Sequence, residues 1–110
     1  MNMYQAQVYY PLKDAKELIL QGWCKNAPAK DAYNRAVAPR SKMAIKWSLY
    51  GAIDATTKLT STLEEVEERL NDTLYFEWDT DGYEDWNDSP ERTLEDVIRL
   101  LDLAMERASR

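Results

Sequence analysis

The feature that most constrains the fold is a broad apolar stripe near the C-terminal end of the chain. Between residues 94 and 108, apolar side chains recur at the spacing of one helix face: Leu94, Val97, Ile98, Leu101, Met105 and Ala108, widened by Leu100 and Leu103. Thr93 precedes this stripe, and its hydroxyl is expected to accept from the Asp96 amide as an N-cap. The sequence therefore predicts a helix over 93–108, at the centre of the fold or in a dimer interface.

Three other stretches also have helical spacing. Pro11 suits a first helical turn and Gly22 a helix end, which predicts a helix over about 11–21. Ser41 as an N-cap predicts a helix over about 42–58, in which Gly51 belongs to a face of small side chains. An apolar stripe opposite a run of glutamates predicts a further helix, over about 62–75.

The remaining segments are expected to connect or flank these helices. Residues 1–10 are aromatic without helical spacing and predict an extended N-terminal arm. Residues 23–40 contain two prolines and predict a long connection, and residues 77–92 predict an acidic loop. The fold class that follows is all-α: one single-domain bundle of four main helices over residues 1–110.

Composition removes several classes of function. The chain has no histidine, which excludes histidine-dependent triads and the commonest metal ligand. Cys24 is the only cysteine, and although Lys25 beside it would favour a thiolate slightly, a buried structural cysteine is the simpler interpretation. No long apolar run predicts a membrane span, and the first residues do not resemble a signal peptide. We therefore expect a cytoplasmic, non-enzymatic protein without a cofactor.

The formal charge of -6 conceals a separation of charge along the chain. Residues 1–58 carry nine Lys and Arg against four acids, whereas residues 59–110 carry five against sixteen. The two halves either pack with their opposite charges adjoining, or they form a polarised surface that steers a charged partner or favours self-association.

The acidic loop has some of the spacing of a calcium loop. Its residues Glu77, Asp79, Asp81, Asp85 and Asp88 fall at positions 1, 3, 5, 9 and 12. The first position is normally Asp and the last a bidentate Glu, so a solvated acidic loop is the alternative.

A basic stretch with aromatic neighbours raises the question of nucleic-acid binding. Arg35, Arg40, Lys42 and Lys46 lie near Tyr33 and Trp47 in the sequence. The overall pI of about 4.6 argues against direct nucleic-acid binding.

Three sequence blocks resemble a family of small uncharacterised proteins from bacteria and their phages. The blocks are Gly22-Trp23-Cys24, then Trp47-Ser48-Leu49-Tyr50-Gly51-Ala52-Ile53, then Trp86-Asn87-Asp88 with Arg92-Thr93 and Asp96-Val97. The resemblance covers about residues 12–108 and implies no activity. It suggests that the three blocks meet in space.

If the blocks meet, they form either a structural clasp or a binding site. We expect Trp23 or Trp86 to fill the hollow beside Gly51, and Asn87 and Asp88 to hydrogen-bond with the backbone of the long connection. Arg92 is expected to pair with Asp88. The candidate binding residues are Trp86, Asn87, Asp88, Arg92, Trp23, Trp47 and Gly51.

The leading hypothesis is a small accessory protein that binds another macromolecule, most simply a protein, with a homodimer as one further arrangement. One alternative is a small-molecule binder whose aromatic pocket is lined by Trp23, Trp47 and Trp86 and closed by Arg92. Another is an acidic inhibitor that mimics nucleic acid and occupies the basic groove of a host protein.

Overall fold

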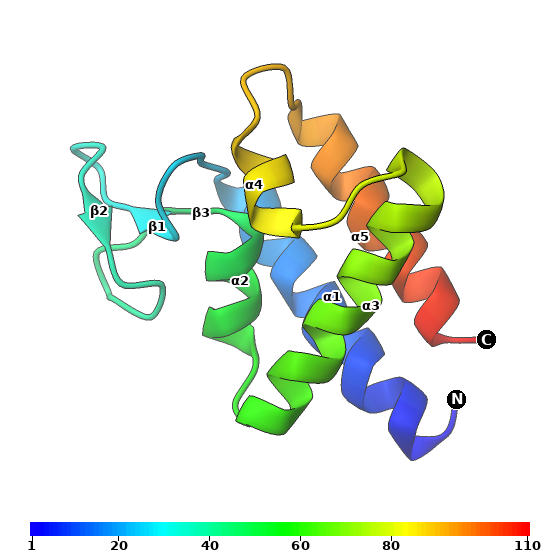
Figure 1. The fold of residues 1–110 in the computed structure, drawn as a ribbon. Helices are drawn as coiled ribbons and strands as arrows, with labels where there is room; N and C mark the ends of the chain where they lie inside the picture. Colours follow the sequence, from blue (N-terminus) through cyan, green and yellow to red (C-terminus); the bar gives the residue numbers. More distant parts are fainter.

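The computed structural model describes residues 1–110 and contains five helices and a small sheet. In chain order the elements are α1 (Met3–Gln21), β1 (Ala29–Lys30), β2 (Ala36–Val37), β3 (Lys46–Trp47), α2 (Leu49–Thr56), α3 (Thr60–Trp78), α4 (Tyr83–Asp88) and α5 (Leu94–Ala108). Figure 1 shows the sheet standing at one side of the helices, away from both chain ends. Helix α1 packs against α2, α3 and α5. The fold is thus mostly helical, as predicted, with a sheet that was not.

The expected extended arm over residues 1–10 is wrong, because α1 begins at Met3. Asn2 caps this helix: its side chain accepts from the Gln5 amide, and the Gln5 side chain accepts from the Asn2 amide. Pro11 lies inside the helix and not at its start. The buried stripe continues on both sides of the proline, through Val8, Leu12, Ala15 and Ile19.

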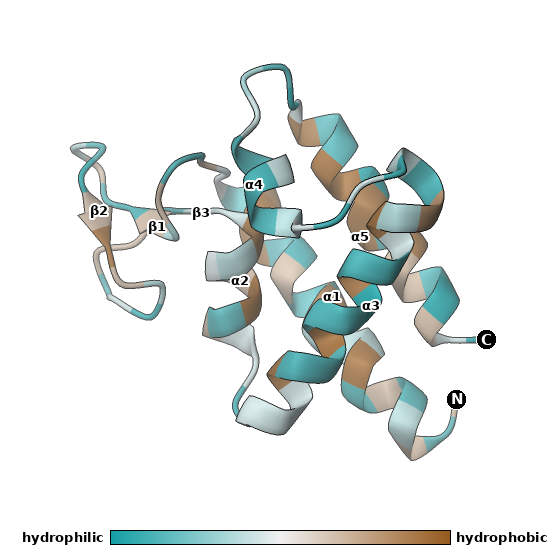
Figure 2. Cartoon of the chain, in the orientation of Figure 1, coloured by the Kyte–Doolittle hydropathy of each residue, from teal (hydrophilic) through white to brown (hydrophobic).

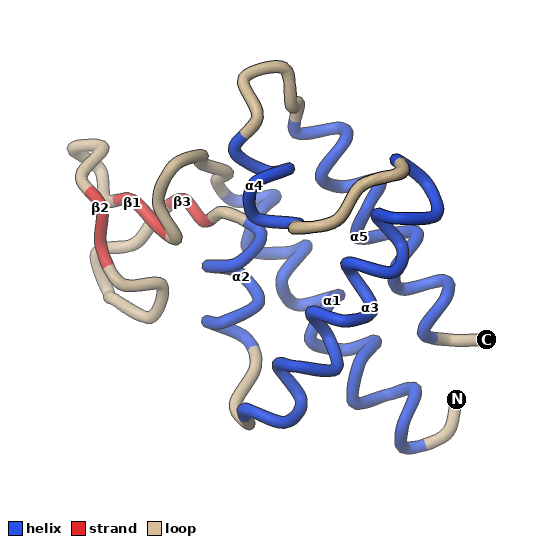
Figure 3. The backbone as a smooth tube through the Cα atoms, viewed as in Figure 1, coloured by secondary structure: helices blue, strands red, loops and turns tan.

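The predicted connection over 23–40 and the predicted helix over 42–58 both contain strands. The sheet has the order β2-β1-β3 with antiparallel pairs throughout, and Figure 3 shows its three short strands. The N-cap of α2 is Ser48, whose hydroxyl accepts from the Gly51 amide, whereas Ser41 lies in a turn before β3. Strands of two residues each are too short to show an alternating pattern in the sequence.

The predicted loop over 77–92 also contains a helix. Helix α3 extends to Trp78, beyond the expected end near residue 75, and Asp79 follows in the left-handed conformation. Gly82 has a φ of 74°, and α4 begins directly after it. The expected start of the last helix is confirmed, because the Thr93 hydroxyl accepts from the Asp96 amide and α5 begins at Leu94.

The core lies between α1, α2, α3 and α5. Figure 2 shows the apolar faces of these helices turned toward one another and polar residues on the outside. The largest fully buried apolar side chains come from all four helices: Leu12, Ile19, Leu49, Ile53, Val66, Leu70, Leu74, Val97, Leu100 and Leu101. None of the helices combines the length and the apolar character that a membrane crossing requires.

Candidate functional site

Asn87 on α4 is the centre of the candidate site. Its side chain is completely buried. Its Oδ1 accepts from the Trp23 indole at 2.8 Å and from the Leu49 amide at 3.2 Å, and its Nδ2 donates to the Cys24 carbonyl at 3.2 Å and to Asp88 at 3.0 Å. An amide side chain has two donor hydrogens and two acceptor lone pairs, so Asn87 has no hydrogen-bonding capacity left for a ligand.

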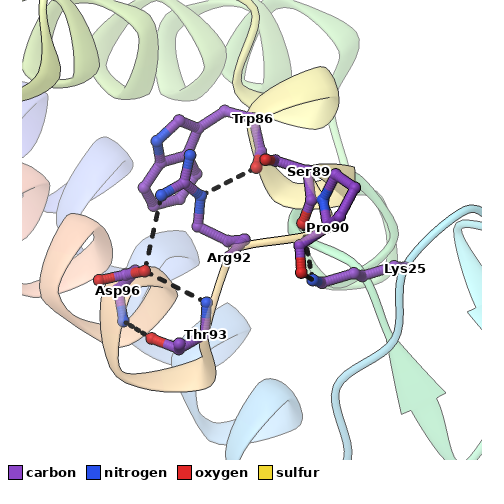
Figure 4. A network of polar contacts seen from close by, with 7 residues as sticks. All are labelled: Lys25, Trp86, Ser89, Pro90, Arg92, Thr93 and Asp96. Atoms are coloured by element: carbon purple, nitrogen blue, oxygen red, sulfur yellow. Dashed lines mark hydrogen bonds and ion pairs between the residues drawn. The ribbon is translucent and has the colours of Figure 1, made fainter.

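Asp88 extends this network to the segment that leads into the sheet. Its carboxylate accepts from the Asn26 amide at 2.9 Å, where Asn26 has a φ of 66°. Next to it, the Lys25 ammonium donates to the carbonyls of Ser89 and Pro90 at 2.6 and 3.2 Å (Figure 4). The expectation that Asn87 and Asp88 bond to the backbone of the connection is therefore confirmed. We call Trp23, Asn87 and Asp88, together with the backbone groups that they hold, the clasp.

Arg92 does not pair with Asp88, contrary to expectation. The chain turns at Ser89, whose carbonyl accepts from the Arg92 amide, and this turn directs Arg92 back over α4. Its Nε donates to the Trp86 carbonyl at 3.0 Å, its guanidinium carbon lies 3.9 Å from the Trp86 ring centroid, and Nη1 lies 3.5 Å from Asp96 (Figure 4). Arg92 is thus a stacked, largely buried link between α4 and α5.

The tryptophans at the candidate site do not line a common cavity. Trp86 is 6% exposed and packs edge-on against Trp78, with ring centroids 5.1 Å apart. The Trp47 indole donates to the Pro39 carbonyl at 3.0 Å, on the other side of the sheet segment. The surface hollows of the molecule, including the largest of about 570 Å³ between α1 and α5, are lined by other residues.

Gly51 faces backbone and not an aromatic ring or a helix. A Cβ atom at this position would lie 1.7 Å from the Pro28 carbonyl oxygen, which accepts from the Ser48 amide at 3.0 Å. The hollow that was expected to hold Trp23 or Trp86 is therefore filled by the segment before β1. A small side chain at position 51 indicates a close approach, but the sequence does not say which segment approaches.

Glu84 is part of the site and was missed in the sequence. Its carboxylate accepts from the Ser48 hydroxyl at 2.7 Å and from the Tyr50 amide at 3.1 Å, so it adds negative charge at the N-terminus of α2. Burial raises the pKa of this carboxyl, although both hydrogen bonds act in the opposite direction. Placing the N-cap at Ser48 would have drawn attention to this helix start.

Burial keeps two further titratable groups, a thiol and a phenol, in their protonated forms. The Cys24 thiol is buried and lies 3.4 Å from the Ala27 carbonyl, and burial raises its pKa, which opposes thiolate formation. The Tyr83 hydroxyl donates to Glu67 at 2.6 Å, and burial also raises the pKa of this phenol. Both groups are protonated at neutral pH.

The acidic residues proposed for calcium are spread over different structures. Positions 7–12 of the proposed loop form α4, Glu77 lies 3.8 Å from Arg99, and Asp88 belongs to the clasp. Asp79, Asp81 and Asp85 are exposed. No group of three or more acidic or cysteine side chains is arranged to hold a metal ion.

Comparison with known families assigns the chain to one of them. A model of a family of unknown function (DUF6197) matches residues 3–107, and the chain therefore belongs to this family. The expected membership of an uncharacterised family is thus confirmed. No curated protein and no solved structure gives a significant match.

Proposed function

We propose that this DUF6197 protein is a non-enzymatic accessory protein that acts by binding another protein. The observation that carries the proposal is a projecting, positively charged segment, residues 25–46, which we call the sheet arm. It contains six Lys and Arg and one acid, and it stands at one side of the helical bundle (Figure 1). A charged surface that projects from the body attracts an oppositely charged partner over distances comparable with the Debye length.

The clasp supports this function because it fixes the base of the sheet arm. Asn87 and Asp88 hold the Cys24 carbonyl and the Asn26 amide, and Pro28 is packed against Gly51. Holding a binding segment in one position before the partner arrives lowers the entropy that is lost on binding. The Asn87 side chain at the centre of the clasp is saturated internally, so it serves positioning and leaves recognition to the exposed arm.

A second candidate is suggested by α3. Its exposed residues Glu64, Glu65, Glu68 and Asp72 form no ion pair with Lys or Arg in the structure. An acidic helix face of this kind suits an inhibitor that occupies the basic groove of a nucleic-acid-handling protein. The first candidate depends on the positive sheet arm and the second on the negative face of α3. Substitutions in one region at a time can therefore distinguish them.

Affinity purification from cells of the source organism tests both candidates. Three baits are compared: the wild-type chain, a sheet-arm variant with Arg40→Glu and Lys42→Glu, and an α3 variant with Glu64→Gln, Glu65→Gln and Glu68→Gln. We expect a partner that is retained by the wild type and the α3 variant, released by added salt, and lost with the sheet-arm variant. Loss with the α3 variant alone would favour the inhibitor. Recovery of no partner, together with turnover of a metabolite by the purified chain, would contradict both.

A further inference from the structure

Two partly exposed lysines lie directly opposite each other in the sheet. Lys30 on β1 pairs directly with Lys46 on β3, so both side chains lie on the same face, while the neighbouring row of Ala29 and Trp47 is buried. The Lys46 stem runs beside Gly22, where an added Cβ would lie 3.0 Å from the Lys46 Cγ. Like charges directly opposite in a sheet are destabilising. Their pairing here therefore opposes folding, and a negatively charged partner would relieve the repulsion.

The chain itself does not supply that partner. Neither lysine has a carboxylate within ion-pair distance, and the only cation of the sheet arm that has one is Arg35, which lies 2.9 Å from Asp31. Arg40 donates to the carbonyls of Asp54 and Thr57 and also has no carboxylate partner. Apart from Arg35, the cations of the sheet arm thus have no carboxylate partner within the folded chain.

Exposed apolar side chains accompany these cations. Met43 is 56% exposed and Ile45 is 46% exposed, and both lie in the turn and loop that lead into β3, between Lys42 and Lys46. Aliphatic side chains between cations suit a protein surface that combines acidic and apolar groups. Single-stranded nucleic acid is held instead by open aromatic faces for base stacking, and the only exposed ring here, Tyr33, has the Arg35 guanidinium over one of its faces at 5.0 Å.

We propose that the face around Lys30 and Lys46, with Met43 and Ile45 at its border, docks an acidic protein segment that carries apolar side chains between its carboxylates. This inference rests on the proposed function and adds to it the surface and the chemistry of the partner. The carboxylates of the segment neutralise the two facing lysines, and its apolar side chains cover Met43 and Ile45. The clasp holds the docking face in position before binding occurs.

The variant Lys30→Glu separates docking from folding. It places a carboxylate opposite Lys46 and so replaces a like-charge pair with an attractive one. We expect the melting temperature to stay the same or rise, while the affinity for an acidic partner falls by about tenfold or more. If Lys30 contributed only to stability, the melting temperature of Lys30→Glu would fall. Arg110→Glu is the charge-matched control for binding, because it changes the charge equally at the chain end away from the sheet (Figure 1) and disturbs only the exposed pair with Glu106.

Fluorescence anisotropy with labelled peptides provides the binding measurement. The probe is a peptide of repeated Leu-Glu-Glu-Leu units, compared with a version that has Gln in place of Glu and with single-stranded DNA. We expect the wild type and Arg110→Glu to bind the acidic peptide, and Lys30→Glu and the glutamine peptide to show weak binding. Met43→Ser with Ile45→Ser should also weaken binding, because the apolar border is removed.

Several outcomes would overturn the inference. Equal binding of the acidic peptide by the wild type and Lys30→Glu would show that this face is not the docking surface. Tighter binding of single-stranded DNA than of the peptide would identify a nucleic-acid surface. Self-association of the wild type that Lys30→Glu abolishes, measured by sedimentation, would make a second copy the occupant. If the cellular partner is retained by Lys30→Glu as by the wild type, the proposed function stands and only this surface is wrong.

Discussion

The Trp23 indole donates a 2.8 Å hydrogen bond to the Asn87 side chain across 64 residues of the chain. This bond joins the segment before the sheet arm to α4, and the same Asn87 oxygen also accepts from the first residue of α2. One buried amide therefore connects three parts of the fold that are distant in sequence. Because the Asn87 side chain is fully buried, breaking one of its hydrogen bonds without a replacement partner costs much of the stabilisation that the bond provides.

Replacing Asn87 with Ala should be strongly destabilising. The Trp23 indole and the Cys24 carbonyl would lose their partner, and the buried Leu49 amide would lose its side-chain acceptor. Each buried group left unsatisfied costs about 1–3 kcal/mol, so we expect a loss of at least about 3 kcal/mol in the free energy of unfolding, measured in urea. Trp23→Phe, which removes one donor, should cost less. A loss below about 1 kcal/mol for Asn87→Ala would contradict the central role of this side chain.

The sequence predicted part of this site: Trp23, Asn87 and Asp88 meet as expected, whereas Gly51 contacts Pro28 and the Trp47 indole bonds to Pro39. Adjacent Asn and Asp residues before a proline indicated side chains that bond to backbone, and the structure confirms this for Asn87 and Asp88. The predicted pairing of Arg92 with Asp88 is wrong because the turn at Ser89 directs its side chain toward Asp96, and no periodic pattern marks that turn. Glu84 was missed because its role depends on the start of α2, which lies later than predicted.

Gly51→Ala should destabilise the protein although alanine is the better helix former. Within a helix this change normally gains about 1 kcal/mol. Here the new Cβ would lie 1.7 Å from the backbone oxygen of Pro28, so the segment before β1 must move and the Ser48 amide loses its acceptor. We expect a net loss of about 2 kcal/mol or more, measured by thermal unfolding.

Ala55→Gly in the same helix is the control for this substitution. Ala55 is partly exposed, so the change should cost only the helix propensity of about 1 kcal/mol. If Gly51→Ala were stabilising, the close approach of Pro28 and α2 would be wrong. The pair of variants thus separates packing against the sheet arm from the intrinsic preference of the helix.

Helices were easier to predict from the sequence than strands for a physical reason. The stripe of α5 repeats over four turns and is framed by a capping pair, so both its existence and its start could be predicted. Each strand has two residues, and β3 also pairs with the backbone around Trp23, which is distant in the sequence. Pro11 is typical of a first helical turn and so favours a late start for α1, whereas the capping box of Asn2 and Gln5 upstream marks the true start.

Cys24 should react slowly with a thiol reagent in the folded protein. The thiol is buried and its pKa is raised by burial, so little thiolate is available near neutral pH. We expect the reaction with a disulfide reagent such as Ellman's to be at least about tenfold slower in buffer than in denaturant. Cys24→Ala should leave binding of the acidic peptide unchanged. Fast labelling of the native chain would indicate a reactive thiol and would reopen a catalytic interpretation.

Glu84 should make the protein more stable as the pH falls from neutral toward 4.5. Burial raises the pKa of this carboxyl above its ordinary value of 4.5, so between the two values the folded state binds more protons than the unfolded state. Lowering the pH through this window therefore favours folding. Below about pH 3.8 the stability of the protein instead falls as the pH is lowered, because backbone hydrogen bonds hold the pKa values of Asp31 and Asp96 below 3.8. Glu84→Gln keeps the contacts with Ser48 and Tyr50 without the charge, so its melting temperature should rise less over the same window. Identical profiles for the two proteins would assign the pH dependence to other groups.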